Sequence, residues 1–410
     1  LLSMARETSH RGPDNTGIWY NSEDGVALGH NRLSILDLSD SANQPMKSES
    51  GRYRIVYNGE IYNHLKIREE LELLGFKTWR GHSDTETILV AIEVWGIKEA
   101  VKKFSGMFSF AIWDSHKKEL SLVRDRMGEK PLYYGWINNV FLFGSELKAL
   151  RKHKSFSPEI DKKSLGLFLK ILSIPAPYSI YKNIFKVEPG MIVTIKENRT
   201  FEHIRYWDYP CYSETDHLKT YNGSFESAQE ELDQLLTSVV GNQMIADVPV
   251  GAFLSGGIDS SLVVALMQSI SSKRVHTYSI SFDDQRYDES TYANSVAEFL
   301  NTKHFTKKVT SNNLFDTVMK LNNIYDEPFS DSSQIPTFLV SEFASNDVKV
   351  VLTGDGADEV FGGYNRHVLI NKYWARFKSY PEPVKRIASI IGSSLSERNW
   401  DLLNHTLNNL

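Results

Sequence analysis

Cysteine is almost absent from this chain, because Cys211 is the single thiol among 410 residues. One thiol excludes an intrachain disulfide and a cysteine-rich zinc site, and such scarcity is typical of a reducing compartment. No apolar run reaches the length of a membrane span, and no signal peptide is recognisable. We therefore expect a cytoplasmic protein with no membrane partner.

A concentrated basic surface is missing too. The net charge is −5, with 46 lysines and arginines against 51 acidic residues. The richest basic stretch, residues 146–154 (ELKALRKHK), is short, and such a run is typical of the solvated face of a helix. A nucleic-acid site needs a clustered basic surface, so we expect no nucleic-acid partner.

Two common nucleotide motifs are also lacking. The chain contains neither GxxxxGK followed by Ser or Thr nor GxGxxG. Residues 255–261 instead read SGGIDSS, between an apolar strand and a helix. Glycines let the backbone approach a ligand, and the N–H groups of the turn and the helix N-terminus face an anion. The missing lysine argues against cleavage between the β- and γ-phosphates.

The side chains of this loop suit a polyphosphate. Ser255, Ser260 and Ser261 add hydroxyl donors, and Asp259 beside a polyphosphate makes sense if it holds Mg²⁺. The alternative interpretation is a glycine turn with a serine cap. The loop predicts a site for ATP and Mg²⁺.

The order of elements differs between the two halves of the chain. Strands at 52–59, 108–114, 119–125, 139–145 and 190–197, with helices at 65–75 and 83–96, fit an αββα sandwich. A capping box is expected at Ser83 and Glu86. After residue 225, strands at 248–254, 275–282 and 348–352 alternate with helices, which indicates a doubly wound parallel sheet. We expect an α/β protein with an α+β first domain (1–208), a polar linker (209–224) and a second domain (225–410).

The second half resembles the pyrophosphate-loop ATPases, which make AMP and pyrophosphate, and within them asparagine synthetase. SGGIDSS matches their SGGxDS signature, and residues 353–364, TGDGADEVFGGY, match the family's second ATP-site motif. Both follow predicted strands, where ligands bind in open α/β sheets. The resemblance assigns ATP binding to Phe253, Ser255, Gly256, Gly257, Asp259, Ser260, Ser261, Ile280, Thr353 and Gly354.

The same resemblance implies roles for acidic residues of this half. Asp358 would join Asp259 on Mg²⁺, and Asp355, a glutamate in many relatives, would face the acceptor carboxylate or ammonia. The alternative for residues 355–359 is an acidic turn that caps a helix. Residues 326–333, DEPFSDSS, resemble a segment that lines the acceptor pocket through Asp326, Glu327, Asp331 and Ser332, or form an ordinary solvated loop.

The first half resembles a class II glutamine amidotransferase, in an N-terminal-nucleophile-type fold. The matching stretches are RGPD (11–14), RLSILD (32–37), QPM (44–46), NGEIYNH (58–64), SDTE (83–86) and RDRMGEKPLYYG (124–135). The resemblance implies that the Asn58 side chain and the Gly59 N–H stabilise an oxyanion, that Arg32 binds the glutamine carboxylate, and that Glu60 and Asp84 bind its ammonium. Alone, Asn58-Gly59 would be a hairpin turn and Asp84 part of a helix cap.

The nucleophile of that family has no match here. It is an N-terminal cysteine, whereas Cys211 lies in the predicted linker and is interpreted as structural or incidental. The family's catalytic lysine and arginine segment also has no counterpart. We expect an internal piece of a longer enzyme, without glutaminase activity as a fragment.

The leading hypothesis is a glutamine-hydrolysing asparagine synthetase that activates aspartate as β-aspartyl-AMP. The first alternative keeps the chemistry but takes another carboxylate acceptor, such as a sugar acid of surface-polysaccharide or secondary-metabolite synthesis. The alternative from another class is a degenerate module that binds ATP or glutamine without catalysis. Members of the family often dimerise, which leaves a homodimer open.

Overall fold

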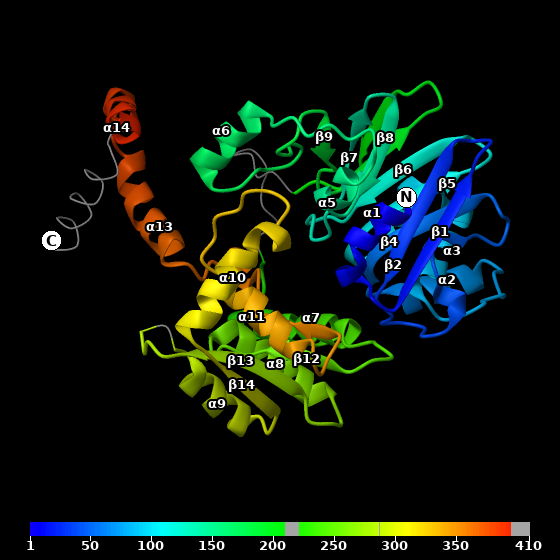
Figure 1. The fold of residues 1–410 in the computed structure, drawn as a ribbon. Coiled ribbons are helices and arrows are strands. Elements are labelled where there is room, and N and C mark those ends of the chain that lie inside the picture. The colour runs from blue at the N-terminus through cyan, green and yellow to red at the C-terminus, as the bar shows by residue number, and fades with distance from the viewer. Residues whose placement is uncertain (210–220, 287, 395–410) are drawn as a thin grey trace. The chain divides into compact units, whose positions relative to one another are not determined.

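The computed structural model describes residues 1–209, 221–286 and 288–394 (Figure 1). The chain divides into two compact units, Leu1–Thr353 and Gly354–Leu410, each treated by itself below. Cys211 and most of the expected linker lie outside the described residues. No helix in the described part of the chain is long and apolar enough to cross a membrane.

The helices of the first unit are α1 Leu2–Glu7, α2 His64–Leu73, α3 Asp84–Trp95, α4 Ile97–Lys103, α5 Leu147–Arg151, α6 Lys162–Ile171, α7 Phe225–Gln243, α8 Ile258–Ile270, α9 Ser290–Phe299, α10 Ser311–Ile324 and α11 Gln334–Ala344. Short 3₁₀ turns are η1 Ser9–Arg11 and η2 Asp40–Ala42. The second unit contains α12 Ala357–Phe361, α13 Asn365–Lys378 and α14 Glu382–Ser394.

The strands are β1 Asn15–Asn21, β2 Val26–Arg32, β3 Met46–Lys47, β4 Tyr53–Ile61, β5 Gly106–Asp114, β6 Glu119–Arg124, β7 Tyr133–Ile137, β8 Val140–Gly144, β9 Ile184–Lys186, β10 Met191–Ile195, β11 Phe201–Arg205, β12 Val250–Phe253, β13 His276–Phe282, β14 Lys303–Val309 and β15 Val350–Leu352.

The first part of the chain folds as a four-layer sandwich. A six-stranded sheet, ordered β11-β10-β6-β5-β4-β3, packs one face against α2 and α3 through residues such as Ile67, Ile88 and Phe108. Its other face meets the small sheets β1-β2 and β8-β7-β9, where Leu28 and Leu122 share a core. Helices α1 and α5 contact each other outside these sheets. Burial of each large apolar side chain in these cores contributes roughly 1.5–3 kcal/mol to the free energy of folding. The predicted αββα sandwich is confirmed.

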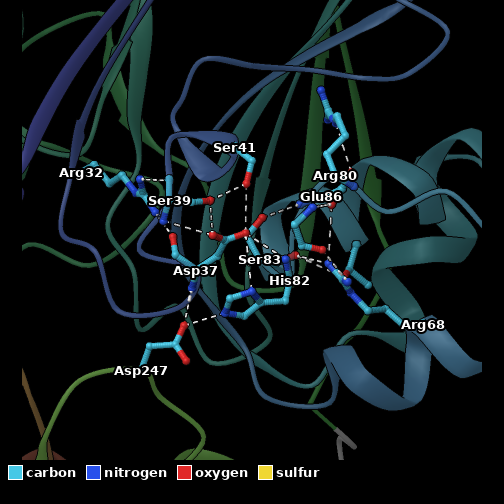
Figure 2. Close-up of polar contacts among 12 residues, drawn as sticks. Arg32, Asp37, Ser39, Ser41, Arg68, Arg80, His82, Ser83, Glu86 and Asp247 are labelled. Carbon is cyan, nitrogen blue, oxygen red and sulfur yellow. Dashed lines mark hydrogen bonds and ion pairs between the residues drawn. The ribbon is translucent and has the colours of Figure 1, made fainter.

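Two local expectations for this part need correction. Asn58-Gly59 forms no hairpin turn, because β4 runs through to Ile61 and Gly59 pairs with Phe108 of β5. The capping box at Ser83 is only half formed. The Ser83 hydroxyl accepts from the Glu86 N–H, but the Glu86 carboxylate accepts from the Arg80 and Gly81 N–H groups instead (Figure 2).

The later part contains the predicted doubly wound sheet. Its order is β14-β13-β12-β15, and all neighbours are parallel. One face is packed by α7, α8 and α9 through residues such as Val264 and Ala293, and the other by α11 through Ala344. The strand order reverses beside β12, so residues after β12 and after β15 lie at the switch point where open α/β sheets bind ligands.

Candidate functional site

A cavity of about 560 Å³ lies in the sandwich. Its walls include all five residues expected to bind glutamine: Arg32, Asn58, Gly59, Glu60 and Asp84. They come from the end of β2, the end of β4 and the start of α3. The structure therefore brings together residues that the sequence separates by up to 52 positions.

Asn58 and Gly59 present hydrogen-bond donors at this cavity. The Asn58 Nδ2 atom is buried and has no partner among the described residues. An unpaired buried donor costs free energy, so such a group commonly serves a ligand. Gly59 is required by close packing, because an added Cβ would lie 2.2 Å from the Met107 carbonyl oxygen. These two residues can donate to an oxygen that becomes negative.

Arg32 is fixed by the loop that follows β2. Its Nη1 donates to the Ser39 carbonyl at 2.9 Å and to Asn43 Oδ1 at 2.8 Å, and its Nη2 donates to the Asp37 carbonyl. These three bonds use three of the five guanidinium N–H groups. The remaining donors suit a carboxylate ligand.

Glu60 and Asp84 are two buried carboxylates near one another. Burial, followed by the charge of Asp84, raises the pKa of Glu60 to about 8, against an opposing effect of Lys130. Burial also raises the pKa of Asp84, although Tyr57 Oη at 2.6 Å and the Ile61 N–H at 2.9 Å donate to its Oδ2. Two carboxylates in such a site favour a cationic ligand, which would allow both to ionise.

Several further residues at the cavity were not singled out from the sequence. Lys130 is one, with its pKa lowered first by burial and then by the charge of Arg11. His30 is another; burial lowers its pKa to about 4, so the ring is neutral. Gln44 accepts from the Tyr57 N–H and donates to Thr85. Lys130 and Gln44 lie inside matched motifs, so the sequence contained a signal that could have identified them as cavity residues. No pattern in the sequence marked His30.

The SGGIDSS loop connects β12 to α8, as predicted. Gly257 is the N-cap of α8, and Ser255 Oγ lies 3.0 Å from Ser260 Oγ. Gly256 has φ +86°, and a Cβ there would lie 2.5 Å from the Tyr292 Cβ atom. The Ser261 Oγ is buried without a partner among the described residues. The first N–H groups of a thirteen-residue helix and these hydroxyls can together bind an anion.

The strands that carry Phe253 and Ile280 are neighbours in the sheet. Phe253 of β12 pairs with Tyr278 of β13, and Ile280 follows two residues later on the same strand. Their backbone groups therefore lie at one end of two adjacent strands. Thr353 follows β15, which pairs with β12 on its other side.

The acidic motif of the second unit surrounds a short helix. Gly356, at φ +89°, is the N-cap of α12, and Asp358 and Glu359 lie in its first turn. The N-cap itself has no side chain, while two carboxylates lie in the first turn of the helix. Gly354 and the exposed Asp355 precede this turn. Among the described residues, no group of three or more His, Cys, Asp or Glu side chains is arranged to hold a metal ion.

The acidic segment 326–333 is bound to the sandwich at its start. Glu327 accepts from Tyr133 Oη at 3.1 Å, from the Ile180 N–H at 2.7 Å and from Lys186 Nζ at 2.6 Å. Asp326 lies 3.5 Å from Lys148 Nζ. These two residues are therefore not a solvated loop, while Asp331 and Ser332 are exposed.

Comparison with known proteins gives two family matches in sequence. Residues 1–207 match a glutamine amidotransferase domain and residues 231–410 match an asparagine synthase domain. A Methanocaldococcus jannaschii protein provisionally named asparagine synthetase (glutamine-hydrolyzing) 2 is 40% identical, over 96% of this chain and 77% of its own length. Asparagine synthetase (glutamine-hydrolyzing) 1 of Bacillus subtilis is 35% identical, over 97% of this chain and 62% of its own length.

Among solved structures, the glutamine phosphoribosylpyrophosphate amidotransferase of B. subtilis, complexed with ADP and GMP, is 15% identical. The match covers 74% of this chain and 62% of the amidotransferase chain, with a TM-score of 0.38. The chain spans less than two thirds of the length of both B. subtilis proteins.

Proposed function

The chain belongs to the glutamine-hydrolysing asparagine synthetase family, and on that premise we propose that it makes asparagine from aspartate, glutamine and ATP. Residues 1–208 bind glutamine for hydrolysis, residues 209–224 link the domains, and residues 225–410 activate aspartate as β-aspartyl-AMP. Ammonia released in the first domain then displaces AMP. The reaction takes place in the cytoplasm.

The observation that supports this proposal most directly is the cavity of the sandwich. It combines a fixed guanidinium (Arg32), an unpaired buried amide donor (Asn58) and two buried carboxylates (Glu60 and Asp84). Glutamine has a carboxylate, an amide oxygen and an ammonium, each of which matches one of these groups. As the amide is attacked, its oxygen gains charge, and Asn58 Nδ2 with the Gly59 N–H stabilise it.

For the ATP half, the loop after β12 supports binding of a polyphosphate. The N–H groups at the start of α8 and the hydroxyls of Ser255, Ser260 and Ser261 donate to phosphate oxygens. Phe253 and Ile280 hold adenine with backbone groups, and Thr353 and Gly354 complete the nucleotide contacts. Mg²⁺ neutralises phosphate charge when it is bound, and it suits single carboxylates combined with phosphate oxygens. Asp259 and Asp358 would hold it, and Asp355 faces the acceptor.

The identity of the acceptor distinguishes this function from amidation of a different carboxylate, such as a sugar acid. The test is pyrophosphate release by the full-length protein with ATP and Mg²⁺, once with aspartate and once with sugar acids. Release with aspartate is expected, and Asp259→Asn should abolish it while leaving glutamine binding intact. Release with a sugar acid but not aspartate would replace the acceptor, and release with neither would favour a non-catalytic module.

A further inference from the structure

Asp247 connects the loop before β12 with two motifs of the amidotransferase half (Figure 2). Its Oδ2 accepts from the Asp37 N–H at 2.7 Å and lies 2.6 Å from His82 Nε2. Its own N–H donates to the Ile35 carbonyl at 3.0 Å. Asp247 thus contacts the RLSILD stretch and His82, which directly precedes the SDTE stretch, although no motif in the sequence assigned Asp247 a role.

Asp37 is held in an unusual conformation at this contact. Its φ of +55° lies in the left-handed region, which disfavours residues with a Cβ and is stabilised for Asp by local hydrogen bonds. Its buried carboxylate accepts from the Ser39 N–H at 3.2 Å and from the His82 N–H at 2.8 Å. Burial alone would raise the pKa of Asp37, but the hydrogen bonds from Ser39 and His82 outweigh it and lower the pKa to about 2.

The backbone of Asp37 also leads directly to the glutamine cavity. The N–H of residue 37 donates to Asp247, while its carbonyl oxygen accepts from Arg32 Nη2. Arg32 is held further by Ser39 and Asn43 of the same loop. One residue therefore lies between a carboxylate from the second half of the chain and the guanidinium of the cavity.

We propose that Asp247 is a positioning residue for glutamine recognition, which holds the 37–43 loop so that Arg32 faces the substrate carboxylate. This inference rests on the proposed function. Without the carboxylate, the Asp37 N–H loses its acceptor at a strained residue, and the loop relaxes away from its left-handed turn. Arg32 then retains its charge but loses its orientation.

The test is glutamine binding by the whole chain, measured by calorimetry, in Asp247→Ala and Asp247→Asn. Loss of a charged acceptor should weaken glutamine binding about tenfold in Asp247→Ala. Asp247→Asn keeps an acceptor oxygen and should restore affinity to within about twofold. ATP affinity should stay unchanged in both variants, whereas a variant that had lost its fold would lose both affinities.

Lys349→Met is the matched control. Lys349 Nζ lies 2.6 Å from Asp14 Oδ2, so this variant breaks another ion pair between the same two parts of the chain without touching Asp37. It should bind glutamine as the parent does. Equal glutamine affinity in Asp247→Ala and the parent, or equal losses in Asp247→Ala and Lys349→Met, would overturn the inference alone. Failure of the parent to bind glutamine would overturn the proposed function as well.

Discussion

At the residue scale, the cavity contains two buried carboxylates, and the negative charge of Asp84 disfavours ionisation of Glu60. Glu60 and Asp84 each have a raised pKa, first because of burial, and the charge of Asp84 adds to the effect on Glu60. An acid whose pKa is higher in the folded state makes folding less favourable as pH rises from its ordinary pKa toward the raised one. For Glu60 that window runs from 4.5 to about 8.

Glutamine binding should therefore depend on pH. In the proposed function the substrate ammonium pairs with an ionised Glu60, so binding below about pH 8 would first have to remove a proton. We expect glutamine affinity to rise from pH 6 toward pH 8, by up to about tenfold per unit, and then to level off. Calorimetry in two buffers of different ionisation enthalpy would detect the released proton.

Glu60→Gln is the control for this dependence. Residue 60 then no longer titrates and only Asp84 does, so the weaker glutamine binding of this variant should rise less steeply with pH than that of the parent. The parent should lose folding stability as pH rises from 4.5 to about 8, because Glu60 ionises less readily in the folded state, and Glu60→Gln should not show this loss. A parent protein whose glutamine affinity is constant across that range would contradict the assignment of Glu60 to the ammonium.

At the element scale, the turn between β12 and α8 depends on one glycine more than on its neighbour. Gly256→Ala puts a Cβ at φ +86° and 2.5 Å from the Tyr292 Cβ atom of α9, whereas a Cβ at Gly257 meets nothing nearer than 3.3 Å. We expect Gly256→Ala to lower the free energy of unfolding by about 3 kcal/mol and Gly257→Ala by less than about 1 kcal/mol. Urea unfolding of both variants measures the difference, and equal losses would show that the contact with α9 is unimportant.

The strands differ in how well the sequence predicts them. The apolar runs before SGGIDSS and within residues 108–114 mark β12 and β5 well, because most side chains of both strands are buried or half-buried. Strand β14 was missed since its sequence, KHFTKKV, carries three lysines whose chains reach solvent. The five residues proposed to bind glutamine were expected from motifs, and their meeting in one cavity could be tested only in three dimensions. The contact of His82 with Asp247 spans 165 residues and leaves no local pattern.

At the scale of the molecule, the unit Leu1–Thr353 contains ion pairs between its early and late parts. Glu327 and Lys186 form one of them, with side chains that are 9% and 14% exposed. Glu327→Gln keeps the shape but removes the charge that compensates a nearly buried ammonium. We expect a loss of about 2–3 kcal/mol in the free energy of unfolding.

Glu159→Gln is the matched variant for this prediction. It breaks the pair between Glu159 and Lys182, whose side chains are largely solvated, so the expected loss is below about 1 kcal/mol. Chemical denaturation at neutral pH compares the two variants. A Glu327→Gln protein as stable as Glu159→Gln would mean that the 326–333 segment is not anchored to the sandwich by charge.

The order of the parallel sheet also has a consequence for synthesis of the chain. Val250 of β12 pairs with Val350 of β15, so one side of the strand that leads into SGGIDSS has its partner 100 positions later. Closing so long an interval is entropically costly and slow compared with pairing of near neighbours. On the ribosome, β12 can meet β13 early, but its other edge stays open until residue 352 has emerged. We therefore expect this end of the sheet to be completed after the cavity of the sandwich, whose lining residues all lie before residue 154.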